Sequence, residues 1–173
     1  MSADALLLDY QNKVASITLN RTDVFNAFDE KIIKDLTDLL LTVEQNNQAR
    51  VLILKAKGKY FSAGADLRWM QRMVNYSLEE NIADAEHLST LMHTLYHLKL
   101  PTIALVQGPA FGGGVGLIAC CDIAVASTNA HFSFSEVKLG LIPAVISPYI
   151  IKTMGERITR RYFLTAEPFS AEQ

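Results

Sequence analysis

Two short loops rich in small residues are the parts of this sequence best suited to chemistry. Residues 62–66 have the sequence Ser-Ala-Gly-Ala-Asp, and residues 112–116 have the sequence Gly-Gly-Gly-Val-Gly. Each follows a predicted strand and opens a predicted helix, where the first backbone N–H groups have no partner within the helix and lie at the positive end of its dipole. Small side chains let a ligand oxygen approach these groups closely. Two such loops could aim a pair of donors at one developing oxyanion, although tight packing of helix on strand alone would also favour small residues.

Glu136 is the carboxylate best placed in sequence to move protons. It follows Phe134 and precedes the apolar residues Val137 and Leu139. An apolar setting raises the pKa of a carboxyl group and suits it to general acid/base catalysis. The alternative is a solvated glutamate on a turn between a strand and a helix.

Other motifs predict competing chemistries, and each lacks a necessary part. Residues 114–119 match a dinucleotide-binding glycine fingerprint, but the helix that follows is short and the preceding strand is too distant. His93 and His97 have a zinc-site spacing without an obvious third ligand. Ser147 is not in a nucleophile-elbow sequence, and Cys120 has no cationic neighbour in sequence, so neither is expected to act as a nucleophile.

Composition predicts a single globular domain spanning residues 1–173. Lys and Arg number 16 against 18 Asp and Glu, and half of the residues are hydrophobic, which excludes a disordered chain and argues against a nucleic-acid partner. No apolar run reaches the roughly 18 residues that a membrane span needs, so no membrane partner is expected. Residues 1–4 lack a basic segment, and Cys120 and Cys121 are expected to be buried thiols, which together predict a cytoplasmic protein.

Apolar periodicity predicts the elements that must position these residues. Strands are expected at residues 6–10 and 14–19, joined as a hairpin, and at residues 51–54, 102–106 and 123–126. Helices are expected over residues 32–43, with Asn26 and Asp29 resembling a helix start, and over residues 67–74, 82–98 and 115–121, the last following a glycine-rich turn at 108–114. This order implies an α/β fold with a largely parallel sheet flanked by helices.

Several motifs, taken in order, resemble the enoyl-CoA hydratase/isomerase (crotonase) family. They cover residues 61–67, 101–108, 112–114, 121–123 and 132–143. The resemblance implies a superhelix of ββα units with mostly parallel sheets, an acyl-CoA substrate, and an enolate held by two backbone N–H groups. It implies no separate cofactor, because coenzyme A is part of the substrate, and no metal.

The resemblance also assigns site residues. The two N–H donors would be those of Ala65 and Gly113, and Glu136 would be the catalytic carboxylate. The residues expected to bind substrate and coenzyme A are Phe25, Ala27, Ala63, Gly64, Asp66, Leu67 and Gly112.

Gly116 departs from the family pattern, because two-acid hydratases have a second glutamate there. Glu136 could do both proton transfers in turn through the same water, or another group could replace the missing acid. The reaction could also be an isomerisation between C2 and C4, which needs only one base. We expect an enoyl-CoA hydratase, with an isomerase or a non-catalytic acyl-CoA-binding protein as the alternatives.

Residues 108–122, 141–148 and 160–167 resemble the bacterial methylglutaconyl-CoA hydratase-like branch. Such substrates carry a second carboxylate, which Arg157, Arg160 or Arg161 could pair with, although a solvated helix face is the simpler reading. Ser170 and Gln173 have the spacing of a helix start. We therefore expect that a C-terminal helical part is missing, and that with it the protein forms a homotrimer or a dimer of trimers.

Overall fold

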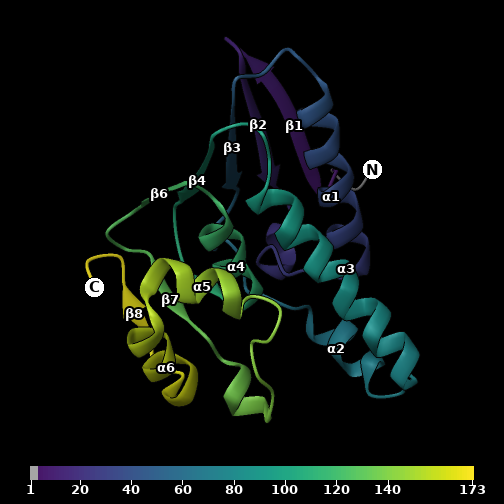
Figure 1. The fold of residues 1–173 in the computed structure, drawn as a ribbon, viewed down its shortest axis with the longest axis vertical. Helices are drawn as coiled ribbons and strands as arrows, with labels where there is room; N and C mark the ends of the chain where they lie inside the picture. The colour runs from purple at the N-terminus through teal and green to yellow at the C-terminus, as the bar shows by residue number, and fades with distance from the viewer. Residues whose placement is uncertain (1–3) are drawn as a thin grey trace.

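Two β-sheets with helices around them make up the computed structural model, which describes residues 4–173 (Figure 1). The larger sheet has the order β1-β2-β3-β4-β6, with β1 antiparallel to β2 and the remaining pairs parallel. Its strands are β1 (Leu6–Gln11), β2 (Val14–Leu19), β3 (Val51–Ala56), β4 (Thr102–Val106) and β6 (Ile123–Ala126). The smaller sheet contains β5 (Ala110–Phe111), β7 (His131–Ser133) and β8 (Phe169–Ser170). The predicted α/β class with a mostly parallel sheet is confirmed.

Within residues 4–173, six α-helices accompany the sheets. They are α1 (Glu30–Gln45), α2 (Leu67–Met73), α3 (Leu78–Tyr96), α4 (Gly113–Cys120), α5 (Ser147–Met154) and α6 (Glu156–Thr165), with short 3-10 helices at Thr22–Val24 and Glu136–Leu139. Helices α1 and α3 lie side by side in Figure 1. Leu36 and Leu40 of α1 and Leu91 and Leu95 of α3 are buried in the same apolar core as Leu54 of β3. Burial of these faces stabilises the layer that carries both loops.

The sequence-based starts of helices α1 and α4 need correction. Helix α1 is capped by Asp29, whose side chain accepts from the N–H of Ile32, whereas Asn26 lies outside the helix. The Asn26 side chain is needed elsewhere, because its amide donates to the carbonyl oxygens of Lys57 and Tyr60 at 2.8 and 2.9 Å. Helix α4 begins at Gly113, two residues before the predicted start at Val115.

The C-terminal segment also differs from expectation. Ser170 is the last residue of β8 and is followed by a turn rather than by a helix. The Gln173 side chain nevertheless accepts from the N–H of Ser170 at 2.9 Å, which is one of the two hydrogen bonds of a capping box.

No helix within residues 4–173 combines the length and apolar character that a membrane crossing requires. The expectation that residues 1–4 carry no basic leader segment falls mostly on residues 1–3, which lie outside the described range.

Candidate active site

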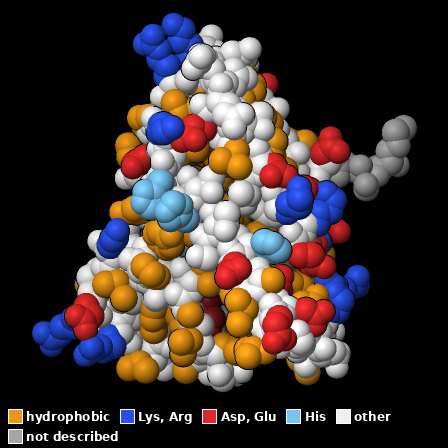
Figure 2. All heavy atoms as spheres, turned by 45° about the vertical axis from the view of Figure 1, so that its right-hand side comes forward, with side chains coloured by type: hydrophobic (Ala, Val, Ile, Leu, Met, Phe, Trp, Pro, Cys, Tyr) orange, Lys and Arg blue, Asp and Glu red, His pale blue; other side chains and the backbone are white. Residues whose placement is uncertain are grey.

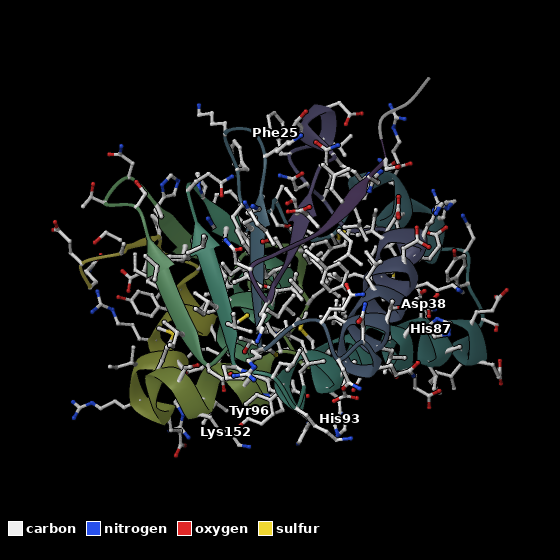
Figure 3. The ribbon with its side chains drawn as sticks, turned by 90° about the horizontal axis from the view of Figure 1, so that it is seen from above. Phe25, Asp38, His87, His93, Tyr96 and Lys152 are labelled. Carbon is white, nitrogen blue, oxygen red and sulfur yellow. The ribbon has the colours of Figure 1, made fainter. Side chains whose placement is uncertain are left out.

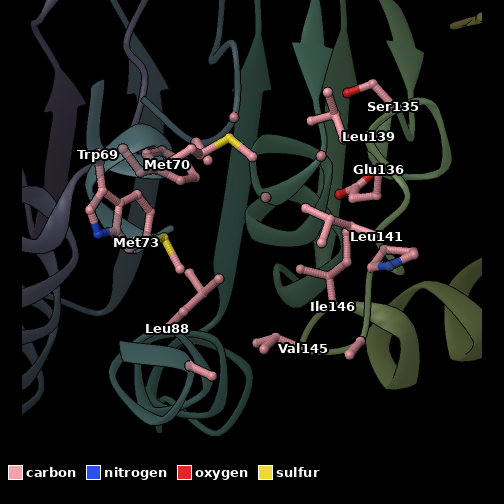
Figure 4. A pocket seen from close by; sticks show the side chains of 18 of the residues that line it. Trp69, Met70, Met73, Leu88, Ser135, Glu136, Leu139, Leu141, Val145 and Ile146 are labelled. Atoms are coloured by element: carbon pink, nitrogen blue, oxygen red, sulfur yellow. The ribbon is translucent and has the colours of Figure 1, made fainter. Parts of the chain in front are cut away.

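One pocket of about 450 Å³ brings the two small-residue loops and Glu136 together. Figure 4 shows Trp69, Met73 and Leu88 on one side of it and Glu136, Leu141 and Ile146 on the other. The space-filling view shows hydrophobic side chains crowded over the lower half of one face (Figure 2). A concave apolar site with a few polar groups is typical of small-molecule binding.

The two loops contact each other directly through backbone groups. The N–H of Phe111 donates to the carbonyl oxygen of Ser62 at 2.9 Å. A Cβ atom added at Gly64 would lie 2.9 Å from the Phe111 oxygen, and one added at Gly114 would lie 2.9 Å from the Ser62 Cβ. The glycines are therefore required by the close approach of the loops.

Ala65 and Gly113 each present an unused N–H at this junction. Phe28 forms a parallel bridge with Ala65. The Phe28 N–H donates to the Gly64 carbonyl oxygen, and the Phe28 carbonyl oxygen accepts from the Asp66 N–H, each at 2.7 Å. This bridge does not use the Ala65 N–H. Gly113 is the first residue of α4, so its N–H has no partner within the helix. Across residues 4–173, neither N–H has an acceptor, and both residues line the pocket.

The Glu136 carboxylate lies against the glycine turn. Gly112 has a φ of +48°, and a Cβ atom added there would lie 2.9 Å from Glu136 Oε1. Oε2 of Glu136 is buried, and no hydrogen-bond partner is found for it within the described residues. Burial raises the pKa of the Glu136 carboxyl above its ordinary value of 4.5. Burial of Oε2 argues against a freely solvated turn, although Val137 and Leu139, which were expected to make the setting apolar, are themselves exposed.

Gly116 is closed to any side chain. It is buried in α4, and a Cβ atom added there would lie only 2.3 Å from Ile146 Cγ2 and 3.2 Å from Met92 Cε. Ile146 is itself buried. The volume in which a second glutamate would begin is therefore filled by an isoleucine, which explains physically why this position is glycine.

The remaining predicted substrate-binding residues divide into two groups. Ala63, Gly64, Leu67 and Gly112 line the pocket with Ala65 and Gly113, whereas Phe25, Ala27 and Asp66 do not. The Phe25 ring is half exposed, packs on Tyr60 and lies at the upper edge of the molecule in Figure 3, far from α3. The carbonyl oxygen of Ala27 accepts from Arg21 at 2.8 Å.

Asp66 has a structural role at the pocket edge. Its side chain accepts from the N–H of Arg68 at 2.8 Å and caps α2, and it lies 3.5 Å from the Arg21 guanidinium. This cap fixes the start of α2 directly after Ala65.

Sequence reasoning missed the wall contributed by α2 and α3. Trp69 and Asp84 line the pocket, and the indole N–H of Trp69 donates to Asp84 Oδ2 at 3.0 Å. Burial raises the pKa of the Asp84 carboxyl, and the Trp69 hydrogen bond partly opposes this. The sequence does contain a signal for this wall. Asp84 lies one position before Ala85 and four before Leu88, so it falls near the apolar face of the helix predicted over residues 82–98.

The competing motifs form no second site. Burial raises the pKa of Cys120 far above that of a reactive thiol and that of Cys121 to about 12. The His93 and His97 rings stack at 4.0 Å, and the Tyr96 ring lies edge-on to His97 at 5.0 Å. Figure 3 shows His93, Tyr96 and Lys152 along the lower edge of the molecule. In the described part of the chain, no three His, Cys, Asp or Glu side chains are grouped to hold a metal ion.

The mostly parallel sheet and the two small-residue loops that meet at this pocket define an α/β protein of the crotonase fold class. A family model described as Enoyl-CoA hydratase/isomerase matches residues 9–173. The chain belongs to the enoyl-CoA hydratase/isomerase family.

Individual relatives agree with this assignment. The solved structure of an enoyl-CoA hydratase from Shewanella pealeana is 51% identical, with a TM-score of 0.96, and the match covers 99% of this chain and 64% of that one. The enoyl-CoA hydratase AKT6-1 of Alternaria alternata is 39% identical over 87% of this chain and 48% of its own length. The hydroxycinnamoyl-CoA hydratase-lyase of Pseudomonas fluorescens is 31% identical over 96% of this chain and 61% of its own. The chain thus spans about half to two thirds of these relatives.

Proposed function

We propose that this protein binds a 2-enoyl-CoA thioester and catalyses the addition of water to its double bond. One observation carries the proposal: a single apolar pocket is lined by two residues with unpaired N–H groups, Ala65 and Gly113, and by the buried carboxylate of Glu136. The names of the enoyl-CoA hydratases that the chain is similar to support the same reaction class.

In this mechanism the thioester oxygen accepts hydrogen bonds from the N–H groups of Ala65 and Gly113. The Glu136 carboxylate takes a proton from water as the water oxygen bonds to C3, and the electrons of the double bond move to the thioester oxygen as an enolate. The protonated Glu136 then delivers that proton to C2, which restores the thioester. Each N–H donor is expected to lower the barrier by about 3 kcal/mol.

The closed space at Gly116 favours a single carboxylate that acts twice. It also keeps an isomerase as the second candidate, since moving a double bond from C3 to C2 needs only one base to carry a proton from C2 to C4. Asp84 is a further carboxylate in the pocket wall.

The proposed acyl group is branched and short. Apolar side chains dominate the pocket lining, including Met73, Leu88, Leu141 and Ile146. Methylglutaconyl-CoA is one branched candidate, but the arginines considered for its second carboxylate do not line the pocket. Arg160 and Arg161 are ion-paired with Glu156 and Glu167 on and beside α6.

The experiment offers 2-enoyl-CoA and 3-enoyl-CoA thioesters to the purified chain and follows products by mass. Uptake of one water by the 2-enoyl substrate supports the hydratase. Conversion of the 3-enoyl substrate without water uptake supports the isomerase. Calorimetric binding without turnover of any substrate supports a non-catalytic acyl-CoA-binding protein and overturns the proposal.

We also propose that the protein associates as a trimer or a dimer of trimers when it carries the C-terminal helical part expected from the sequence. Light scattering on a protein that includes this part tests the proposal, because the assembly should have three or six times the mass of one chain. A monomer at assay concentration would contradict it.

A further inference from the structure

Asp84 places an acidic group in a wall that is otherwise apolar. It belongs to α3 and lines the pocket beside Trp69, Met73 and Leu88. The indole N–H of Trp69, a residue that is only 4% exposed, holds Oδ2 of Asp84 at 3.0 Å. A buried indole has little freedom to move, so the position of this carboxylate is fixed relative to the pocket.

The charged groups around the pocket are unbalanced. Asp84 and Glu136 are the acidic residues among those that line it, and no Lys, Arg or His side chain of the described residues joins them there. Arg72 and His87 are close enough to influence Asp84. Arg72, however, donates to both carboxylate oxygens of Glu30 at 2.6 and 2.9 Å. Figure 2 likewise shows acidic side chains beside the hydrophobic region and most blue side chains at the edges of that face.

This arrangement has a direct consequence for binding. An acyl group with its own carboxylate would lose its hydration on entry and meet a fixed negative charge, and none of the residues that line the pocket is a Lys, Arg or His that could pair with it. A neutral acyl group of the same shape would contact the same apolar side chains without that cost. Like-charge repulsion of this kind is a common way to reject a close analogue.

We propose that Asp84, held by Trp69, is a specificity-determining residue that excludes acyl groups carrying a second carboxylate and so selects neutral, branched acyl-CoA thioesters. The inference rests on the proposed function in one respect, namely that this pocket holds the acyl chain. It refines the substrate class, since methylglutaconyl-CoA would then be a poor ligand.

The test measures binding of two saturated thioesters that cannot be hydrated. They are 3-methylpentanoyl-CoA and 3-methylglutaryl-CoA, which differ in a terminal methyl or carboxylate group. Calorimetry on the full chain at pH 8 should give a dissociation constant at least about tenfold lower for the neutral ligand. Asp84→Asn keeps the side-chain shape and should reduce this ratio by about tenfold.

Two further variants separate charge from packing. Glu86→Gln removes one negative charge from the same helix at an exposed position outside the pocket, and it should leave the ratio unchanged. Trp69→Phe removes the indole N–H that fixes the Asp84 carboxylate, so the ratio should fall severalfold toward that of Asp84→Asn. If Asp84→Asn does not fold, the Trp69→Phe ratio decides, and an unchanged ratio in the folded Trp69→Phe protein would overturn the role of the fixed carboxylate.

The outcomes separate the inference from the proposed function. Equal or tighter binding of 3-methylglutaryl-CoA by the wild-type chain, or an unchanged ratio in folded Asp84→Asn, would overturn the role of Asp84 while leaving hydration intact. Selective binding of the neutral thioester without turnover of any 2-enoyl-CoA would support Asp84 and overturn the hydratase.

Discussion

Gly116 shows most clearly how one residue can limit the chemistry of the site. Alanine is ordinarily favoured over glycine within a helix by about 1 kcal/mol. Here a Cβ atom would lie 2.3 Å from Ile146 Cγ2, so we expect Gly116→Ala to destabilise the fold by about 1–3 kcal/mol. Urea denaturation measures the change in the free energy of unfolding.

A double-mutant cycle with Ile146→Ala gives the matched control. Removing the isoleucine side chain alone leaves a cavity, whereas adding the alanine methyl group to that background should recover part of the lost stability. Additive effects in the double variant would show that Ile146 does not occupy the space beside Gly116.

Glu136 predicts a dependence of stability on pH. Because burial raises the pKa of its carboxyl above 4.5, the folded protein binds this proton more tightly than the unfolded chain. The stabilisation of the folded state by this proton is complete below about pH 4.5. It is lost as the pH rises through the raised pKa of Glu136 in the folded state. Glu136→Gln removes this loss, so the variant should be more stable than wild type at neutral pH by about 1 kcal/mol.

Thermal unfolding of both proteins across pH checks this expectation. The advantage of Glu136→Gln should grow from pH 4 to neutral pH. A variant that is less stable than wild type throughout would show that the carboxylate has a stabilising partner in the fold.

At the scale of elements, α2 depends on the capping residue directly before it, Asp66. Asp66 caps this helix and lies 3.5 Å from Arg21, and the N–H proposed to bind the thioester belongs to the preceding residue. Asp66→Ala should cost about 1 kcal/mol of stability and lower kcat, because the cap that fixes Ala65 is lost. The side-chain oxygen in Asp66→Asn can still accept from the helix N–H groups, so this variant should retain most of the stability and most of the kcat.

Kinetics with the two variants distinguish a cap from a ligand. If Asp66 contacted coenzyme A through its charge, Asp66→Asn would raise KM as much as Asp66→Ala does.

The main elements could be predicted from the sequence where the pattern extended over several residues. Helix α1 and strands β3 and β4 have clear apolar periodicity. Strands β5 and β8 have two residues each, too few for a period, and their pairing depends on distant parts of the chain. Asn26 and Asp29 together resemble a helix start in the sequence, but only Asp29 caps α1. The side chain of Asn26 instead makes hydrogen bonds to residues more than 30 positions away, which the sequence cannot show.

The candidate site was predictable to a similar degree. Its loops and Glu136 lie in compact motifs, so sequence alone located them. The opposite wall could not be predicted, because Trp69 and Asp84 reach the pocket through the packing of α2 and α3. Similarly, only three-dimensional packing shows that Ile146 fills the space at Gly116.

At the scale of the whole molecule, the parallel sheet brings the ends of β3 and β4 to one edge. The loops that follow these strands meet there, joined by the hydrogen bond from Phe111 to Ser62, and the 3-10 helix that begins at Glu136 lies beside them. The pocket thus forms where three segments distant in sequence converge. The proposed chemistry requires all three, whereas the proposed selectivity depends on α2 and α3.

The most direct test of the central claim compares hydration of a branched, neutral 2-enoyl-CoA by the wild-type chain and by Glu136→Gln. The account predicts that kcat falls by about 10²–10⁴-fold in the variant while calorimetry shows that it still binds the saturated thioester. A folded Glu136→Gln protein that keeps more than about a tenth of the wild-type rate would contradict the account, because another group would then have to move the protons.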